Sequence, residues 1–148
     1  MTDPELTVRD AALTDISSIM ALEQGSIIHP WTENDIRTLI TDKNKNCLVA
    51  TLGDEVICYI GAESVLDECN IGNIVTAKAH RGHGYATDVM SNLLNILREN
   101  GIKKVFLEVE NDNVPAIALY RKLGFGQYGY RRDYYGQGKD AILMSEDL

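Results

Sequence analysis

Two glycines, Gly82 and Gly84, lie between a strand-like run at 73–77 and a helix-like run. Glycine lets the backbone turn tightly and expose its N–H groups, and the start of a helix adds unpaired amides and a positive dipole end. Arg81 and His83 place two side-chain donors beside the turn. These groups predict a loop that holds a pyrophosphate, whereas many glycine-rich turns only reverse the chain.

A second candidate for chemistry is Glu108, on the polar side of the strand-like run 103–110. A carboxylate on a central strand is costly unless it is solvated or paired. One interpretation makes Glu108 a general base, because an attacking α-amine has a pKa of about 7.7–8.0 and must first lose a proton. The other makes it a solvated glutamate at the rim of the sheet. The pattern alone leaves both open.

Strand-like and helix-like segments alternate along the chain, which predicts one α/β (α+β) domain over residues 1–148. Strands are expected at 6–9, 47–52, 56–63, 70–77, 103–110, 125–133 and 140–144. Helices are expected after an N-cap at Thr14, after a capping box of Thr32 and Asp35, over 87–100, and after a cap at Asn113. The glycine loop then meets the third helix, and Glu108 lies on the strand that follows it.

The composition is ordinary for a globular chain and excludes several classes of function. The 148 residues are 45% hydrophobic and 24% charged, with a formal net charge of −8. Such a chain lacks the concentrated basic surface that binds nucleic acid, so no direct nucleic-acid partner is expected. The acidic start is unlike a signal peptide, and no run is long enough to span a membrane, which predicts a cytoplasmic protein without membrane contact. Monomer is the default expectation.

The cysteines and histidines predict neither a metal site nor a thiol nucleophile. Cys47, Cys58 and Cys69 fall in strand-like apolar runs, as reduced, buried packing residues do. The three histidines are not spaced as ligands of a structural zinc would be. No histidine accompanies a cysteine in a recognisable motif, which disfavours a covalent route.

The order of the expected elements, together with the motif Arg81-x-x-Gly84-x-Ala86, resembles one enzyme family. Over essentially its whole length the chain resembles the GNAT family of acetyl-CoA-dependent N-acetyltransferases. The likeness is greatest to the RimI-type enzymes, which acetylate the N-terminal amine of a ribosomal protein. It is carried by residues 29–33, 73–76, 107–125, 131–135 and 140–144. The implied fold is a mixed, mostly antiparallel sheet of about seven strands flanked by four helices.

The resemblance implies acetyl-CoA as the acetyl donor and assigns the residues that hold it. In the family, the strand before the glycine loop diverges from the next strand, and the pantetheine arm pairs with the backbone exposed in the wedge. By this likeness Ile74, Val75 and Thr76 line the wedge. The residues that cradle the pyrophosphate are Arg81, Gly82, His83, Gly84, Tyr85, Ala86 and Thr87.

The resemblance also implies direct acetyl transfer without a covalent intermediate. Glu108 is then the base, and Tyr120 matches the tyrosine that protonates the departing thiolate of coenzyme A. By its pattern alone Tyr120 is a core aromatic on the inward face of its helix. Asn113 matches a position that contacts the cofactor, and it serves equally as a helix cap.

Substrate contact is expected from two parts of the chain. Tyr134 and Tyr135 match tyrosines that hold the backbone of the substrate's first residues, while Glu23, Gln24 and Trp31 are further candidates to wall a peptide groove. The implied acceptor is an N-terminus beginning with Ala on a small-subunit ribosomal protein. Two alternatives stay open: acetylation of a lysine side chain or a small amine, and a non-catalytic acyl-CoA-binding sensor.

Overall fold

The computed structural model describes residues 5–26 and 31–148, so the predicted segment at His29 and Pro30 lies outside the described residues, as does the start of the chain. Its strands are β1 (Leu6–Asp10), β2 (Lys45–Leu52), β3 (Glu55–Val65), β4 (Glu68–Thr76), β5 (Lys104–Glu110), β6 (Gly126–Gly136) and β7 (Lys139–Asp147). Its helices are α1 (Ile16–Ser26), α2 (Glu33–Thr41), α3 (Tyr85–Glu99) and α4 (Val114–Lys122). Short 3-10 turns span Leu13–Asp15 and Lys78–His80.

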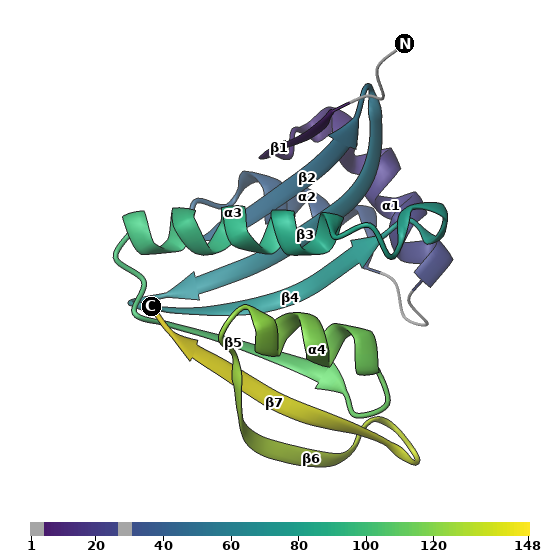
Figure 1. Cartoon of the computed structure of the whole chain (residues 1–148). Helices are drawn as coiled ribbons and strands as arrows, with labels where there is room; N and C mark the ends of the chain where they lie inside the picture. Colours follow the sequence, from purple (N-terminus) through teal and green to yellow (C-terminus); the bar gives the residue numbers. More distant parts are fainter. Residues whose placement is uncertain (1–4, 27–30) are drawn as a thin grey trace.

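The strands form one seven-stranded sheet in the order β1-β2-β3-β4-β5-β7-β6. Neighbouring strands run antiparallel except β4 and β5, which are parallel because α3 connects them across one face. This arrangement confirms the expected mixed, mostly antiparallel sheet. It also places the one parallel pair at the centre of the sheet, as Figure 1 shows.

Helices cover the two faces of the sheet unequally. In Figure 1, α3 and α4 cross one face, and α1 and α2 lie against the other face of the β1–β4 half. The apolar residues divide in the same way, because those of α3 and α4 pack in one core and those of α1 and α2 in a second. The second face of β5, β7 and β6 therefore carries no helix among the described residues.

The strands β4 and β5 pair over only three residues and then separate. Their parallel register joins Glu68 with Lys104, Cys69 with Val105, and Asn70 with Phe106. Beyond these pairs β4 continues to Thr76 and β5 to Glu110. Main-chain groups on the facing edges of both strands are therefore left without a sheet partner, which creates the expected wedge.

A β-bulge in β4 lies beside this wedge. Gly61 of β3 pairs with Asn73 and Ala62 pairs with Ile71, so Gly72 is the extra residue. A Cβ at Gly72 would lie 3.3 Å from two ring atoms of Trp31. The absence of a side chain thus lets the indole pack directly on the bulge.

The caps of the helices are confirmed with one exception. Thr32 and Asp35 form the predicted capping box, and Asn113 caps α4. The N-cap predicted at Thr14 is wrong, because a 3-10 turn precedes α1 and Asp15 supplies the capping carboxylate, which accepts from the Ala12 N–H at 2.7 Å. An ion pair at 2.7 Å with the guanidinium of Arg9 fixes that carboxylate and holds its pKa below the usual range.

Candidate functional site

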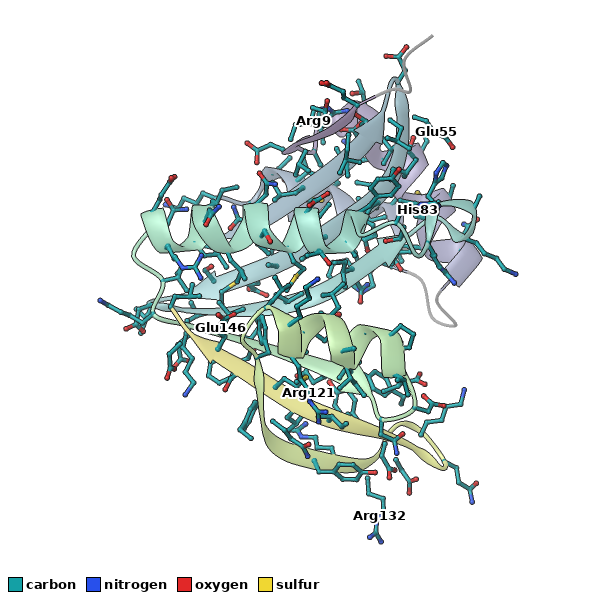
Figure 2. All side chains as sticks on the ribbon, in the orientation of Figure 1. Arg9, Glu55, His83, Arg121, Arg132 and Glu146 are labelled. Carbon is teal, nitrogen blue, oxygen red and sulfur yellow. The ribbon has the colours of Figure 1, made fainter. Side chains whose placement is uncertain are left out.

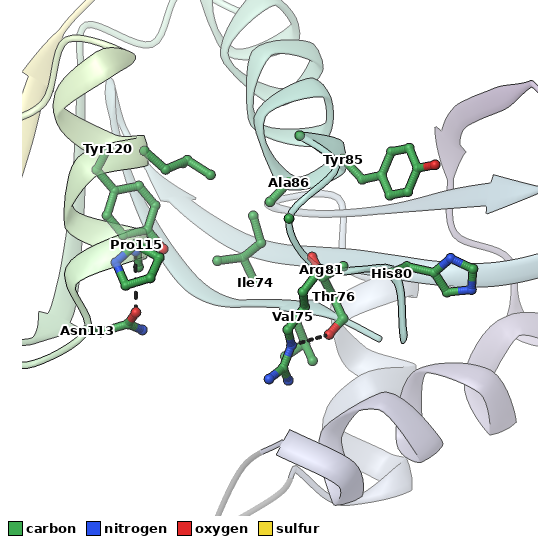
Figure 3. A pocket seen from close by; sticks show the side chains of 14 residues that line it. Ile74, Val75, Thr76, His80, Arg81, Tyr85, Ala86, Asn113, Pro115 and Tyr120 are labelled. Atoms are coloured by element: carbon green, nitrogen blue, oxygen red, sulfur yellow. Dashed lines mark hydrogen bonds between the residues drawn. The ribbon is translucent and has the colours of Figure 1, made fainter. Parts of the chain in front are cut away.

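A pocket of about 760 Å³ opens where β4, the glycine loop and α4 meet. Figure 3 shows the residues that line it, which come from the end of β4, the glycine loop with the start of α3, and α4. The structure brings ten of the predicted site residues to its wall: Ile74, Val75, Thr76, Arg81, Gly82, Gly84, Tyr85, Ala86, Asn113 and Tyr120. Residues far apart in the sequence thus form one cavity, with the wedge edge of β4 along its side.

The glycine loop has the backbone conformation that the sequence predicts. Gly82 and Gly84 have φ values of 83° and 81°, which a residue with a side chain adopts only with strain. Gly84 is the N-cap of α3, so no side chain caps the first amides of that helix. The Arg81 Nε donates to the carbonyl of Thr76 at 3.1 Å and ties the loop to the end of β4 (Figure 3). The loop amides can therefore face a bound anion.

Two predicted loop residues do not line the pocket. His83, labelled in Figure 2, is exposed, and its ring centroid lies 5.6 Å from that of Tyr85. Thr87 is half-buried in the first turn of α3 and is not among the residues that line the cavity. His80, to which the sequence analysis gives no role, lines the pocket instead. It is the last residue of a 3-10 turn, and its ring centroid lies 6.5 Å from that of Tyr85.

Tyr120 places its hydroxyl group in a nearly dry environment. The residue is 6% exposed, and its ring meets Phe125 edge-on at 6.0 Å. Burial, and next the neighbouring Cys58, raises the pKa of Tyr120 to about 12. The hydroxyl therefore stays protonated at physiological pH and is available as a hydrogen-bond or proton donor.

The helix α4 contributes more to the wall than the sequence analysis predicts. Pro115, Ala116 and Leu119 also line the pocket, on the same side of α4 as Tyr120. The Oδ1 of Asn113 accepts from the Ala116 N–H at 3.3 Å, as a cap does, while the residue also borders the cavity. Both interpretations of Asn113 are therefore compatible with its position. The helical spacing of these residues was a signal that could have identified them.

Glu108 lies outside this pocket, on the opposite face of the sheet. Its neighbours Leu107 and Val109 point into the core under α4, so the alternation of the strand turns Glu108 to the helix-free face. There its side chain is exposed. The carboxylate is thus solvated at the edge of the wedge, reachable from the side opposite the pocket.

Tyr134 and Tyr135 lie in β6 rather than in the predicted loop. Their rings meet edge-on at 5.0 Å. Tyr135 is 39% exposed, and its pKa is raised by the partial burial of the ring and then by the carboxylate of Glu108. The structure therefore brings Tyr135 and Glu108 together on the helix-free face.

The segment that carries these tyrosines is held by one carboxylate. Between the pairs of Arg131 with Ala141 and of Gly136 with Lys139, Asp140 alone faces four residues of β6. Its Oδ1 accepts from the Asp133 N–H at 2.8 Å, and its other oxygen accepts from the hydroxyl of a neighbouring tyrosine, Tyr130. Nearby, the side chain of Arg132 projects into solvent (Figure 2).

Glu23, Gln24 and Trp31, the further candidates to wall a peptide groove, differ in their positions. Gln24 is exposed, whereas Glu23 is completely buried and accepts hydrogen bonds from Tyr59 and Asn73. Trp31 packs on the β4 bulge at Gly72. Glu23 and Trp31 therefore lie beside the wedge, on the same face as Glu108.

The cysteines, the potential metal ligands and the length of the helices bear on other kinds of function. All three cysteines are free and buried, as predicted. Within residues 5–26 and 31–148, His, Cys, Asp and Glu side chains do not gather in threes as metal ligands would. None of the helices described is long and apolar enough to cross a membrane.

The chain is similar to known acetyltransferases in sequence and in fold. Residues 13–125 match the sequence profile described as the acetyltransferase (GNAT) family. A ribosomal protein bS18-alanine N-acetyltransferase of Salmonella typhimurium is 31% identical over 142 residues, covering 94% of this chain and 95% of that protein. The enzyme of the same name from Haemophilus ducreyi is 30% identical over 135 residues, covering 88% and 92%.

The likeness in fold is equally extensive. The crystal structure of the ribosomal-protein-S18-alanine N-acetyltransferase from Escherichia coli matches with a TM-score of 0.89 at 26% identity, over 97% of this chain and 94% of that chain. The fold and the family resemblance expected from the sequence are thereby confirmed.

Substitution of Gly84 should weaken the binding of acetyl-CoA. A Cβ at Gly84 meets no atom within 4 Å, so G84A introduces backbone strain of about 1–2 kcal/mol at φ 81° without a clash. Relief of that strain shifts the loop N–H groups away from the positions in which they would bind the pyrophosphate. We expect the dissociation constant for acetyl-CoA, measured by isothermal titration calorimetry, to rise about fivefold or more.

Gly101 provides a matched control at the other end of α3. Its φ is 80°, and a Cβ there also meets no atom within 4 Å. G101A should lower the free energy of unfolding in urea about as much as G84A, while acetyl-CoA binding stays unchanged. Equal acetyl-CoA affinities of the two variants would contradict the assigned role of the loop.

Proposed function

From the premise that the chain belongs to the acetyltransferase (GNAT) family, we propose that it acetylates the N-terminal α-amine of a ribosomal protein. Acetyl-CoA is the donor, and an acceptor beginning with Ala is favoured. Among the described residues, the observation that supports this most is the separation of β4 from β5 after three residue pairs. We infer that this separation lets the two substrates meet between the pocket and the face that carries Glu108.

The residues of the pocket fit the parts of coenzyme A. The amides of the glycine loop and the first turn of α3 suit its pyrophosphate, which is anionic. The free edge of β4 suits the amide groups of the pantetheine arm, because these can pair with main-chain N–H and C=O groups as a strand would. The thioester then reaches the wedge beside Tyr120.

The acceptor follows from the relatives and from the helix-free face. Two relatives that share about 30% of their residues with this chain carry the name ribosomal protein bS18-alanine N-acetyltransferase. Glu108 and Tyr135 gather on the exposed face, where an extended peptide end can approach the wedge. The net charge of −8 favours a basic partner such as a ribosomal protein. We place the proposed reaction in the cytoplasm, as the sequence analysis predicts.

Each group of the chain has a distinct task in this reaction. Acetyl-CoA supplies the acetyl group as a thioester. Glu108, directly or through water, accepts the proton that the amine loses, and a main-chain N–H near Val75 donates to the oxygen that gains negative charge. The Tyr120 hydroxyl delivers a proton to the departing sulfur. The amide bond forms, the carbon–sulfur bond breaks, and one proton moves from the amine side to the thiol side.

A covalent cysteine route is disfavoured by the environment of the thiols. Burial raises the pKa of Cys58 to about 11 and that of Cys47 to about 12. A thiol must ionise to act as a nucleophile, so these buried groups stay inert near neutral pH.

Removal of either proposed proton carrier should reduce turnover. E108Q and Y120F are each expected to lower kcat about 100-fold or more, while the dissociation constant for acetyl-CoA stays within about twofold. Stopped-flow or thiol-release assays measure kcat, and calorimetry measures affinity. Y128F serves as the control, because it removes an exposed hydroxyl on β6. Wild-type turnover in both E108Q and Y120F would contradict their roles.

The pH dependence of the wild type provides an independent check on Tyr120. The proton donor must be protonated, and its pKa lies at about 12. Activity with a peptide should therefore rise as the α-ammonium deprotonates and should hold without an alkaline decline up to about pH 10. A decline in activity that begins near pH 8 and disappears in Y120F would show that the pKa of Tyr120 is much lower, and it would contradict this assignment.

The nature of the acceptor is tested with peptides that contain one internal lysine. Mass spectrometry should place the acetyl group on the α-amine of an Ala-initiated peptide, and the same peptide with a blocked N-terminus should give no product. Acetylation of the lysine in the blocked peptide would favour the alternative acceptor. Binding of acetyl-CoA without any acetylated amine would favour a sensor.

A further inference from the structure

A buried carboxylate lies beside the wedge and has no task in the mechanism described so far. Glu23 of α1 is 0% exposed. Its Oε1 accepts from the hydroxyl of Tyr59 and, at 2.9 Å, from the Nδ2 of Asn73. Its Oε2 is buried and has no hydrogen-bond partner among the described residues. Burial of a carboxylate is costly, so its position is of interest for function.

The bond from Asn73 to Glu23 fixes the direction of the asparagine side chain. A carboxylate only accepts hydrogen bonds, so the amide must present its NH₂ end to Glu23. Its oxygen therefore points away from α1, and no described residue donates to it. Asn73 is only half-buried. An acceptor of fixed orientation is thus available at the surface of the wedge.

The sheet places Asn73 opposite Glu108. The last β4–β5 pair is Asn70 with Phe106, and Glu108 lies two residues further along β5. On β4 the bulge residue Gly72 intervenes, so Asn73 is the residue at the corresponding level. Asn73 faces α1, and Glu108 faces away from α4. The two side chains therefore lie on the same face, on opposite sides of the wedge.

We propose that the Asn73 side-chain oxygen accepts a hydrogen bond from the attacking α-amine, and that Glu23 is a positioning residue that holds this oxygen toward the wedge. The inference rests on the proposed function and extends it to the acceptor subsite. A neutral primary amine has two N–H groups and one lone pair. Asn73 holds one N–H, the other faces Glu108, and the lone pair is left to attack the thioester carbon.

This arrangement selects primary over secondary amines. An N-methylated amine has one N–H fewer, so it cannot satisfy Asn73 and Glu108 together. Removal of the Asn73 acceptor should therefore reduce discrimination between substrates that differ in that one N–H group. The selectivity is therefore a property that a merely structural asparagine would not influence.

The test compares N73A with the wild type on an Ala-initiated peptide and on its N-methylalanine counterpart. We expect N73A to lower kcat/KM for the first peptide about tenfold or more, with the acetyl-CoA dissociation constant within about twofold. The preference for the primary amine should fall by a similar factor. The control is Asn92→Ala, at an exposed asparagine of α3, which should behave as the wild type.

Glu23 is tested by a pair of substitutions at one position. E23Q keeps an oxygen that accepts from Asn73 and should retain peptide kcat/KM within about threefold. E23L removes the acceptor and should reproduce the N73A defect, including the lost preference for a primary amine. Thermal unfolding of all variants separates this defect from misfolding, and E23Q and N73A decide the matter if E23L does not fold.

The outcomes separate this inference from the proposed function. Unchanged kcat/KM and unchanged amine preference in N73A, with an active wild type, would overturn the role of Asn73 alone. An equal loss on both peptides in N73A would also overturn it. A wild type that acetylates only lysine or small amines would overturn the proposed acceptor, whatever the substitutions do.

Discussion

Beyond their third residue pair, β4 and β5 have main-chain donors and acceptors that no neighbouring strand satisfies. Such groups must bind water or another partner, so the free edge of β4 is a preformed binding surface inside the sheet. The rest of the site depends on this separation. In the proposed reaction, it lets the thioester in the pocket meet a substrate that approaches from the face where Glu108 and Tyr135 lie.

The two faces of the sheet differ in polarity at the wedge, and the difference suits their proposed tasks. On the pocket side Tyr120 is nearly buried, and its pKa is raised, which keeps its proton available. On the other side the side chain of Glu108 is exposed to solvent and is accessible to an approaching substrate. The proposed proton acceptor and proton donor thus lie in opposite environments on the two faces of the sheet.

Much of the fold and of the candidate site could be predicted from the sequence, because the patterns that indicate them lie within short stretches of the chain. Glycine spacing gave the loop around Gly84, helical spacing gave the inward face of α4, and alternation gave the two faces of β5. The exceptions arise from tertiary contacts. Asp15 replaces Thr14 at the start of α1 because Arg9 fixes its carboxylate, and β6 extends through Tyr135 because Asp140 binds the Asp133 backbone.

The buried cluster of Glu23, Tyr59 and Asn73 shows the limit of such reasoning most clearly. These residues come from α1, β3 and β4, and Tyr59 and Asn73 lie 36 and 50 positions after Glu23 in the sequence. Each has an ordinary local pattern, so only the packed structure reveals that one carboxylate orients an amide at the wedge. The role of Trp31 on the Gly72 bulge was equally invisible to spacing.

The central claim is that the free edge of β4 receives the donor, and amide hydrogen exchange tests it most directly. Acetyl-CoA at saturating concentration should slow exchange of the wedge-facing amides of residues 71–76 on β4. Amides of β3, which is paired on both sides, should change little. Protection confined to the glycine loop, with β4 exchange unchanged while the ligand is bound, would contradict the account.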